Sequence, residues 1–523
     1  MKKRNRIIAT TLALVMVLSC FSGCAKGGTG GSTKGNKHTN PDATEILITY
    51  WNAGMGREWL DNTIEAFETK YSDYYVTLVA SANMNAVNAS LGMADVDKTD
   101  IYMSITSVID EEYILPLEDI LESTADGDQT PIKDKMDSSF LERCKSSDGH
   151  VYSITCGGGI TGIVYNMELF NEAGIKQLPR TTDELAAVCD TLYNHDITPI
   201  CHFGDNGYYH YMDALFTAQY DGMDYLVNNF YACKDENGVS PSKEVLLKKD
   251  GRYYALKAWE KVITPEYVLQ GSNSKTHTEI QTEFASGKAA MMVNGSWLRN
   301  EIASMGTDNI RMMQSPVLSS IVDKLSTVKN DYTLRALITA IDQVKSGEKQ
   351  ASDFASGENY VVDGTTVSAE DWNRVLEARY SVTSNYLAQG AYVPEYSDNI
   401  EGAKKFIQFM CSDEGLKIYY DTCQSPKPFH YSTGEKIDTG KYGEFEKQQF
   451  VIMDNAENLI EEEIASRHAI FKVGGATAYA GINYSDKLST LNTSSRMTAD
   501  EIWEKVVKTI DEKYDGTWLP NIK

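Results

Sequence analysis

Residues 157–162 form a glycine-rich pattern whose spacing is associated with nucleotide chemistry. The segment Gly-Gly-Gly-Ile-Thr-Gly satisfies G-x-G-x-x-G, which binds the pyrophosphate of a dinucleotide only where a helix opens at the glycines. Here Ile163-Val164-Tyr165 reads as a strand, and a helix is expected only from about Glu168. The pattern therefore predicts either a tight turn between strands or a crossing between lobes, where glycines allow a ligand to approach the backbone.

Other residues have side chains that could bind a metal or take part in catalysis, but they lack the spacing that these functions require. His202, Asp205 and His210 match neither H-E-x-x-H nor H-x-x-x-H, and the adjacent Cys201 and His202 cannot easily ligate one ion. No G-x-S-x-G elbow and no P-loop occur. Acidic residues are so numerous that some pair could always be imagined at the carboxylate separation of a glycosidase, and the sequence does not measure that distance. Such a pair is therefore no evidence for glycosidase activity. We expect no enzymatic activity, no metal and no cofactor.

The first two dozen residues have the pattern of an export signal. Four basic residues precede an apolar run over residues 7–18, and small residues then lead to Cys24. The run is short for a helix that crosses a bilayer core of ~30 Å. The segment resembles a bacterial lipoprotein signal, which implies cleavage after residue 23 and a lipid on Cys24. Residues 24–43 are rich in Gly, Ser, Thr and Lys and predict a flexible tether.

The composition excludes some partners and predicts more than one folded unit. The formal charge is −25, and residues 1–23 carry four basic and no acidic groups, so the chain from Cys24 onward has a charge of −29. This charge argues against nucleic acid and against an anionic membrane surface as partners. About 500 mature residues exceed what one core serves, so two lobes are expected. The seven cysteines beyond Cys24 have no zinc-like spacing and are expected to be buried thiols.

The positions of apolar residues predict an α/β architecture. Residues 45–51 and 74–80 read as strands, and between them Leu60, Ile64, Phe67 and Tyr71 recur on one helical face. Strands that alternate with helices at this spacing imply parallel strands with crossover helices. A mostly helical stretch over about 321–379, broken by a loop at 355–367, is also predicted. Two later helices are predicted at 401–420, where Ala403, Phe406, Ile407 and Met410 form an apolar stripe, and at 499–513, where Thr498 and Glu501 form a capping box.

Three segments resemble the extracellular solute-binding proteins of carbohydrate ABC transporters. They are residues 148–152 followed by 161–174 and 178–185, residues 284–297, and residues 403–410 with 412–415. The second of them, Phe-Ala-Ser-Gly-Lys-Ala-Ala-Met-Met-Val-Asn-Gly-Ser-Trp, is close to the family motif F-x-x-GKAAM-x-x-NGSW. The resemblance covers most of the chain from Glu45 to about Tyr420 and is weaker over about 317–380 and beyond Lys427.

The resemblance implies two discontinuous α/β lobes of the periplasmic-binding-protein type, joined by crossing strands that act as a hinge. By this analogy the first lobe contains residues 44–156 and 309–420, and the second contains 157–308 and 421–523. Closure of the hinge on a ligand would stabilise the closed state.

The same resemblance implies a ligand site between the lobes. Trp297 matches the motif tryptophan that stacks on a sugar, and an Asn-Gly turn before it is expected to expose the ring. Trp51 and Asn52 end the first strand, where open α/β sheets bind ligands. The remaining candidates are a serine in the loop after the strand at residue 100, two glycines at the crossing with free backbone N–H groups, and two tyrosines of a polar loop: Ser107, Gly158, Gly159, Tyr208 and Tyr209.

The implied function is that of a lipid-anchored extracellular receptor. It would be a monomer that captures an oligosaccharide or related sugar and delivers it to the membrane subunits of an ABC permease. Two alternatives stay open at this point. One is a surface-anchored glycoside hydrolase, which needs two carboxylates across the scissile bond. The other is an adhesive lipoprotein that binds no small ligand.

Overall fold

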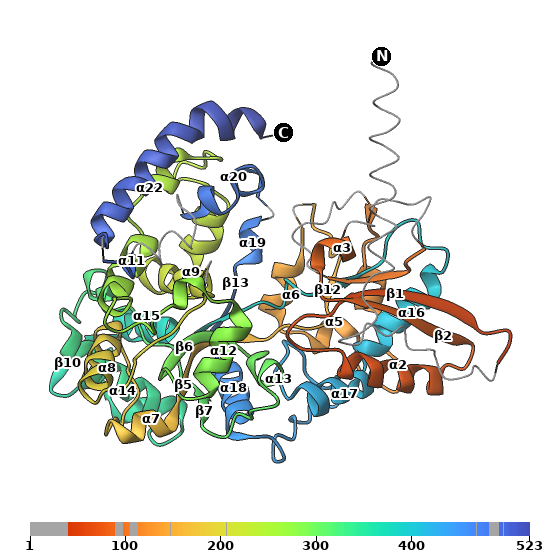
Figure 1. Cartoon of the computed structure of the whole chain (residues 1–523), viewed down its shortest axis with the longest axis horizontal. Helices are drawn as coiled ribbons and strands as arrows, with labels where there is room; N and C mark the ends of the chain where they lie inside the picture. Colours follow the sequence, from red (N-terminus) through yellow and green to blue (C-terminus); the bar gives the residue numbers. More distant parts are fainter. Residues whose placement is uncertain are drawn as a thin grey trace.

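The computed structural model describes residues 40–88, 91, 98–104, 113–146, 148–204, 207–466, 468–480, 491–494 and 496–522. The predicted signal, Cys24 and most of the tether lie outside these residues. The described chain forms two α/β lobes that lie side by side (Figure 1). No helix in the described part of the chain has both the length and the apolar character needed to cross a membrane.

The first lobe is built on a five-stranded sheet of order β2-β1-β3-β12-β4. The strands are β1 (Thr44–Trp51), β2 (Tyr74–Ser81), β3 (Ile101–Ser104), β12 (Gly390–Tyr392) and β4 (Ile154–Thr155). β1 is parallel to β2 and β3, and β12 is antiparallel to β3 and β4. The alternating burial along β1 reflects the period of two of a strand between two layers. The predicted parallel strands with crossover connections are confirmed.

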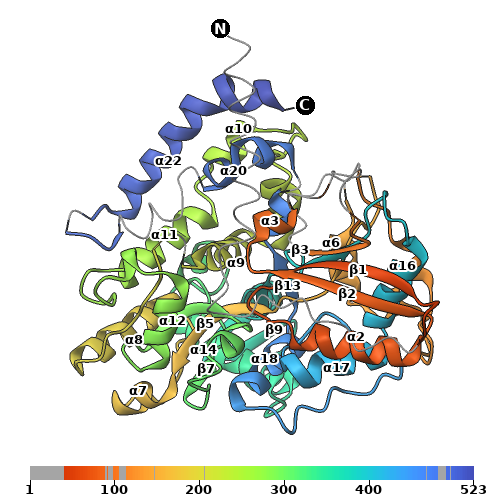
Figure 2. The same cartoon turned by 45° about the vertical axis from the view of Figure 1, so that its right-hand side comes forward.

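Helices cover both faces of this sheet. Figure 2 shows α2 and α17 along one face and α3 on the other. The predicted stripe on α16 is buried in the core at Ala403, Phe406, Ile407 and Met410. The helices of this lobe are α2 (Glu58–Lys70), α3 (Met84–Asn88), α4 (Glu118–Glu122), α5 (Ile132–Lys135), α6 (Ser138–Cys144), α16 (Ile400–Met410) and α17 (Asp413–Cys423).

The second lobe contains the sheet β13-β11-β5-β6, with β7 also paired to β5. The strands are β13 (Asn458–Glu461), β11 (Ser381–Ser384), β5 (Ile160–Asn166), β6 (Met291–Gly295) and β7 (Ile310–Met312). β5 is buried along its whole length, as expected for a central strand. The helices are α7 (Met167–Glu172), α8 (Thr182–Asn194), α9 (Tyr209–Asp221), α10 (Lys243–Leu247), α11 (Gly251–Val262), α12 (His277–Ala285), α13 (Leu298–Glu301), α18 (Glu444–Asp454), α19 (Glu463–Ser466), α20 (Ala469–Ala480) and α22 (Ala499–Lys513).

The strand pairing corrects the predicted lobe boundaries. Because β7 and β11 pair with β5, residues 309–384 lie with the second lobe and not with the first. Residues just beyond 420 stay with the first lobe, where His430 N donates to Lys135 O at 2.7 Å. The chain returns to the second lobe at α18, which packs against β7. These pairings join residues that are far apart in sequence, so local patterns could not reveal them.

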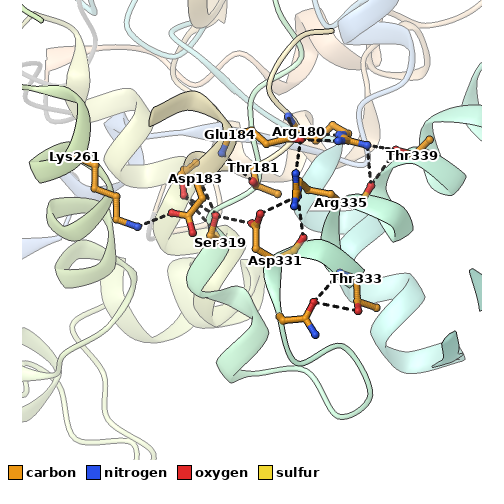
Figure 3. A network of polar contacts seen from close by, with 12 residues as sticks. Arg180, Thr181, Asp183, Glu184, Lys261, Ser319, Asp331, Thr333, Arg335 and Thr339 are labelled. Atoms are coloured by element: carbon orange, nitrogen blue, oxygen red, sulfur yellow. Dashed lines mark hydrogen bonds and ion pairs between the residues drawn. The ribbon is translucent and has the colours of Figure 1, made fainter. Parts of the chain in front are cut away.

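The segment 317–380, where the resemblance was weak, forms its own small core on the second lobe. It contains α14 (Asp331–Lys345), α15 (Ala369–Arg379) and a three-stranded sheet of β8 (Ala355–Ser356), β9 (Asn359–Val362) and β10 (Thr365–Ser368). This sheet corrects the loop predicted at 355–367. Figure 3 shows the polar contacts between α14 and the start of α8 in the second lobe. The Glu184 carboxylate accepts from Arg180 at 2.5 Å and from Arg335 at 3.3 Å.

Candidate functional site

Three chain segments pass between the lobes, and the predicted glycines form the first of them. Gly159 N donates to the Asn385 Oδ1 of the second crossing at 2.8 Å, and Asn385 N donates to Gly159 O at 3.1 Å. Gly158 has a φ of +90°, and its carbonyl accepts from the Tyr419 hydroxyl at 3.1 Å. A Cβ on Gly159 would lie 2.4 Å from the Cβ of Ser296. Both glycines are buried and allow the crossings to pack. The prediction that Gly159 offers its N–H to a ligand is therefore wrong.

A buried carboxylate holds the second crossing in place. Glu461 at the end of β13 is 1% exposed and accepts hydrogen bonds from the Ser384 hydroxyl, Tyr386 N at 3.3 Å and Leu387 N at 3.1 Å. Burial raises the pKa of Glu461 to about 7. No sequence motif contains Glu461, and its hydrogen-bond partners are more than 70 residues away, so local patterns do not single it out.

A buried lysine lies beside the crossings. The Nζ of Lys427 lies 4.0 Å from the ring centroid of Tyr419 and 5.6 Å from that of Trp59. No ion pair between Lys427 and a carboxylate is present among the described residues. Burial lowers the pKa of Lys427, so the protein holds its charged form at a cost in free energy.

We expect Lys427→Met to stabilise the protein. The substitution removes the cost of burying an ammonium group and loses the attraction to two aromatic rings, so the net gain in unfolding free energy should be about 1–2 kcal/mol at pH 7. Urea denaturation measures it. As a control, the exposed Lys249 lies 4.3 Å from the Tyr253 ring, and Lys249→Met should change stability by no more than about 0.5 kcal/mol. A loss of stability in Lys427→Met would contradict this account.

The ends of β1 and β3 bring two polar atoms to the same edge of the first sheet. The Asn52 Oδ1 and the Ser104 Oγ are buried, and neither has a hydrogen-bond partner within the described residues. β1 and β3 are parallel with Tyr50 opposite Met103, so Ser104 ends β3 beside Trp51, and Asn52 directly follows β1. Trp51 is partly buried nearby against Tyr102 and Tyr392. Ser107 lies outside the described residues, so Ser104 is the serine that the structure places at this edge.

The second lobe contributes a group of aromatic rings. The ring centroids of Tyr208 and Trp297 are 5.3 Å apart at an interplanar angle of 75°, and Tyr211 lies 6.4 Å from Trp297. Tyr208 has a φ of +61°, which is uncommon for a residue with a side chain and fixes the ring at the start of α9. The neighbouring Tyr209 is 1% exposed and packs against Trp259 in the core of the lobe. The prediction of Tyr209 as a ligand contact is therefore wrong.

Trp297 lies where the two lobes meet. It is 4% exposed, because Gly295 of its own lobe and Gly54 of the first lobe both pack against it. Asn294 and Gly295 belong to β6 and do not form the exposing turn that was predicted. The structure therefore brings Trp297 and Tyr208 together with the turn after Trp51 and Asn52, but it buries the tryptophan between the lobes.

Other predicted features of the site have a simple structural outcome. The seven cysteines beyond Cys24 are buried, as predicted, and all seven are free thiols. Of the three residues considered for a metal site, His202 and His210 lie within the part of the chain that the structure describes, and Asp205 lies outside it. In the described part of the chain, no group of three or more His, Cys, Asp or Glu side chains is arranged to hold a metal ion.

Two α/β lobes joined by crossing segments, with polar and aromatic side chains where the lobes meet, define a two-lobed binding protein. The chain is identified as a bacterial extracellular solute-binding protein, because the model of that family matches residues 53–311, about half of the chain. Members of this family bind solutes without transforming them, which agrees with the prediction that the chain is not an enzyme.

Individual relatives agree with this class. The xylose/arabinose-binding protein XacG of Haloferax volcanii is 24% identical over 269 residues, which are 49% of this chain and 54% of the relative. The multiple sugar-binding protein of Streptococcus mutans is 26% identical over 153 residues, 28% of this chain and 34% of the relative. The chain spans about half or less of the length of the curated relatives it matches. Among solved structures, RafE in complex with raffinose superposes with a TM-score of 0.58 at 13% identity, covering 90% of this chain and 99% of RafE, which shows the shared fold.

Proposed function

We propose that this protein is the receptor of an ABC importer and captures an oligosaccharide or related sugar between its lobes. The observation that carries the proposal is Trp297 of the second lobe, which packs against Tyr208 of its own lobe and against Gly54 in the turn after β1 of the first lobe. Aromatic rings bind the apolar faces of sugars. The buried Asn52 Oδ1 and Ser104 Oγ at the nearby strand ends add acceptors for hydroxyl groups. A relative and a superposable structure are described by the sugars they bind.

A thermal-shift screen tests the proposal. The panel contains monosaccharides and oligosaccharides, including xylose, arabinose, raffinose and mannobiose. A bound sugar at 100 times its Kd stabilises the folded state by about 2.7 kcal/mol and should raise the Tm by about 3 °C. No rise with any sugar would contradict the proposal and favour an adhesive lipoprotein. Release of shorter sugars during incubation would favour a glycoside hydrolase.

The receptor is further proposed to be held at the outer face of the cell membrane by a lipid on Cys24. A fixed anchor and a flexible tether at residues 24–43 keep the receptor close to a permease in the same membrane. Mass spectrometry of the mature protein should find the chain beginning at Cys24 with an added lipid mass. A mature chain that begins elsewhere, or an unmodified Cys24, would contradict the anchor.

A further inference from the structure

The short helix α13 of the second lobe contacts the first lobe directly. In Figure 1, α13 lies between the two sheets, close to α17. The Asn300 Nδ2 donates a hydrogen bond to the Gly54 carbonyl of the first lobe at 2.8 Å. The adjacent Arg299 pairs with Glu446 of its own lobe at 3.3 Å, and its Nη1 lies 3.4 Å from the Thr422 carbonyl of the first lobe. Two consecutive side chains of α13 therefore bridge the lobes.

The lobes pack closely at this contact. A Cβ on Gly54 would lie 2.8 Å from the Trp297 Cβ and 3.1 Å from the Glu301 Oε1, and a Cβ on Gly56 would lie 3.0 Å from the Asn300 Nδ2. The cavity beside it has a volume of about 40 Å³, room for a few waters at most. Glycines on the first lobe allow this close contact between the lobes.

The Glu301 carboxyl is enclosed in the same contact. It accepts a hydrogen bond from the Gln281 side chain of α12. Among the described residues no lysine, arginine or histidine forms an ion pair with it. Three other titratable or charged side chains surround the contact: Tyr208 before α9, Arg299, which turns toward Glu446, and Glu58 of α2 on the far side of the cavity.

The protonation of Glu301 is therefore linked to how the lobes meet. Burial raises the pKa of Glu301 from its ordinary 4.5 to about 7. When the lobes separate, the carboxyl returns to water and its pKa returns toward the ordinary value. The contact thus favours the protonated form. Its stability is greatest below pH 4.5, falls as the pH rises toward 7, and levels off above pH 7.

We propose that Asn300 and Glu301 form an interlobe latch that holds Trp297 against the turn after β1, so that both are positioning residues for ligand capture and do not contact the ligand. The inference rests on the proposed function for its biological meaning, since a receptor must close to retain its ligand. The latch would also affect the ligand affinity. Because contacts between the lobes already favour the closed state, the ligand needs to supply less of the free energy of closure.

Small-angle X-ray scattering of the mature protein without added sugar tests the latch. The closing equilibrium of the wild type should weaken between pH 5 and pH 8, by roughly 100-fold at most when opening removes the whole pKa shift, so the radius of gyration should increase. Glu301→Gln, which stays neutral and keeps its shape, should have the same radius at both pH values. Asn300→Ala should have a larger radius than the wild type at pH 5, because it lacks the hydrogen bond to the Gly54 carbonyl. Glu504→Gln, an exposed carboxyl on α22, is the matched control and should follow the wild type.

An unchanged radius of the wild type between pH 5 and pH 8 would overturn the latch. So would a Glu301→Gln variant whose pH response equals that of the wild type. The affinity for a sugar identified in the screen provides a second readout. Asn300→Ala should raise its Kd roughly tenfold by shifting the population to the open state. If no sugar binds but the radius of gyration changes with pH as expected, the proposed function is refuted and the latch is supported. If a sugar binds but the radius does not change with pH, the proposed function is supported and the latch is refuted.

Discussion

Trp297→Ala should reduce the affinity for the captured sugar by about 2–3 kcal/mol, roughly 30- to 150-fold in Kd. The substitution removes the ring that packs against Tyr208 and against Gly54 of the opposite lobe. It therefore removes an aromatic ring from the contact between the lobes and loosens that contact. Isothermal titration with a sugar from the screen measures the change.

Trp372→Ala is the matched control for this substitution. Trp372 is also 4% exposed, but it lies in the small core of residues 317–380, stacked on Tyr360 at 4.2 Å. Both substitutions remove a buried tryptophan and should lower stability by about 3–5 kcal/mol. Only Trp297→Ala should lower the affinity, provided that binding is measured where both variants are folded. Equal affinities in the two variants would contradict the role of Trp297.

Glu461→Ala should lower the free energy of unfolding by about 3–5 kcal/mol. The substitution leaves the Ser384 hydroxyl and the N–H groups of Tyr386 and Leu387 without their acceptor in a buried crossing, and each such donor costs about 1–3 kcal/mol. Urea denaturation measures the loss. The control is Glu457→Ala, which removes a partly exposed carboxyl paired with Lys345 and should cost about 1 kcal/mol or less. Equal losses in the two variants would contradict the account.

The pH dependence of stability provides a second test of Glu461. Its pKa is raised to about 7 in the folded protein, so its contribution to stability is present below the ordinary pKa of 4.5 and is lost as the pH rises through 7. The wild type should therefore lose stability between pH 5 and pH 8 relative to Glu461→Gln, which does not titrate. Parallel curves for the two proteins would contradict the assigned pKa.

Local sequence patterns predicted those parts of the fold that depend on neighbours in sequence. The apolar stripe on α16 and the Thr498–Glu501 capping box of α22 are both present, because spacing along one helix determines them. The strand–glycine turn–strand pattern that leads into β5 is present for the same reason. The resemblance to a family predicted the two-lobed architecture, which no single pattern implied.

Features that depend on long-range contacts could not be predicted. The lobe boundary at residue 309 was wrong because β7 and β11 find their partner in β5. Trp297 was expected to be exposed, and its burial results from Gly54 of the other lobe. Glu461 and Lys427 belong to no motif, and their burial arises only when the crossings pack. Glu301 alone had a local signal, since it follows Trp297 by four residues on one helical face.

Isothermal titration of the wild-type protein with each sugar that raises the Tm tests directly whether the protein is a sugar receptor. We expect a single site per chain and a Kd of about 1 μM, which corresponds to about −8 kcal/mol. The sugar should be recovered intact at the end of the titration. Absence of binding heat for every sugar, or recovery of shorter sugars, would contradict the assignment of this protein as a sugar receptor.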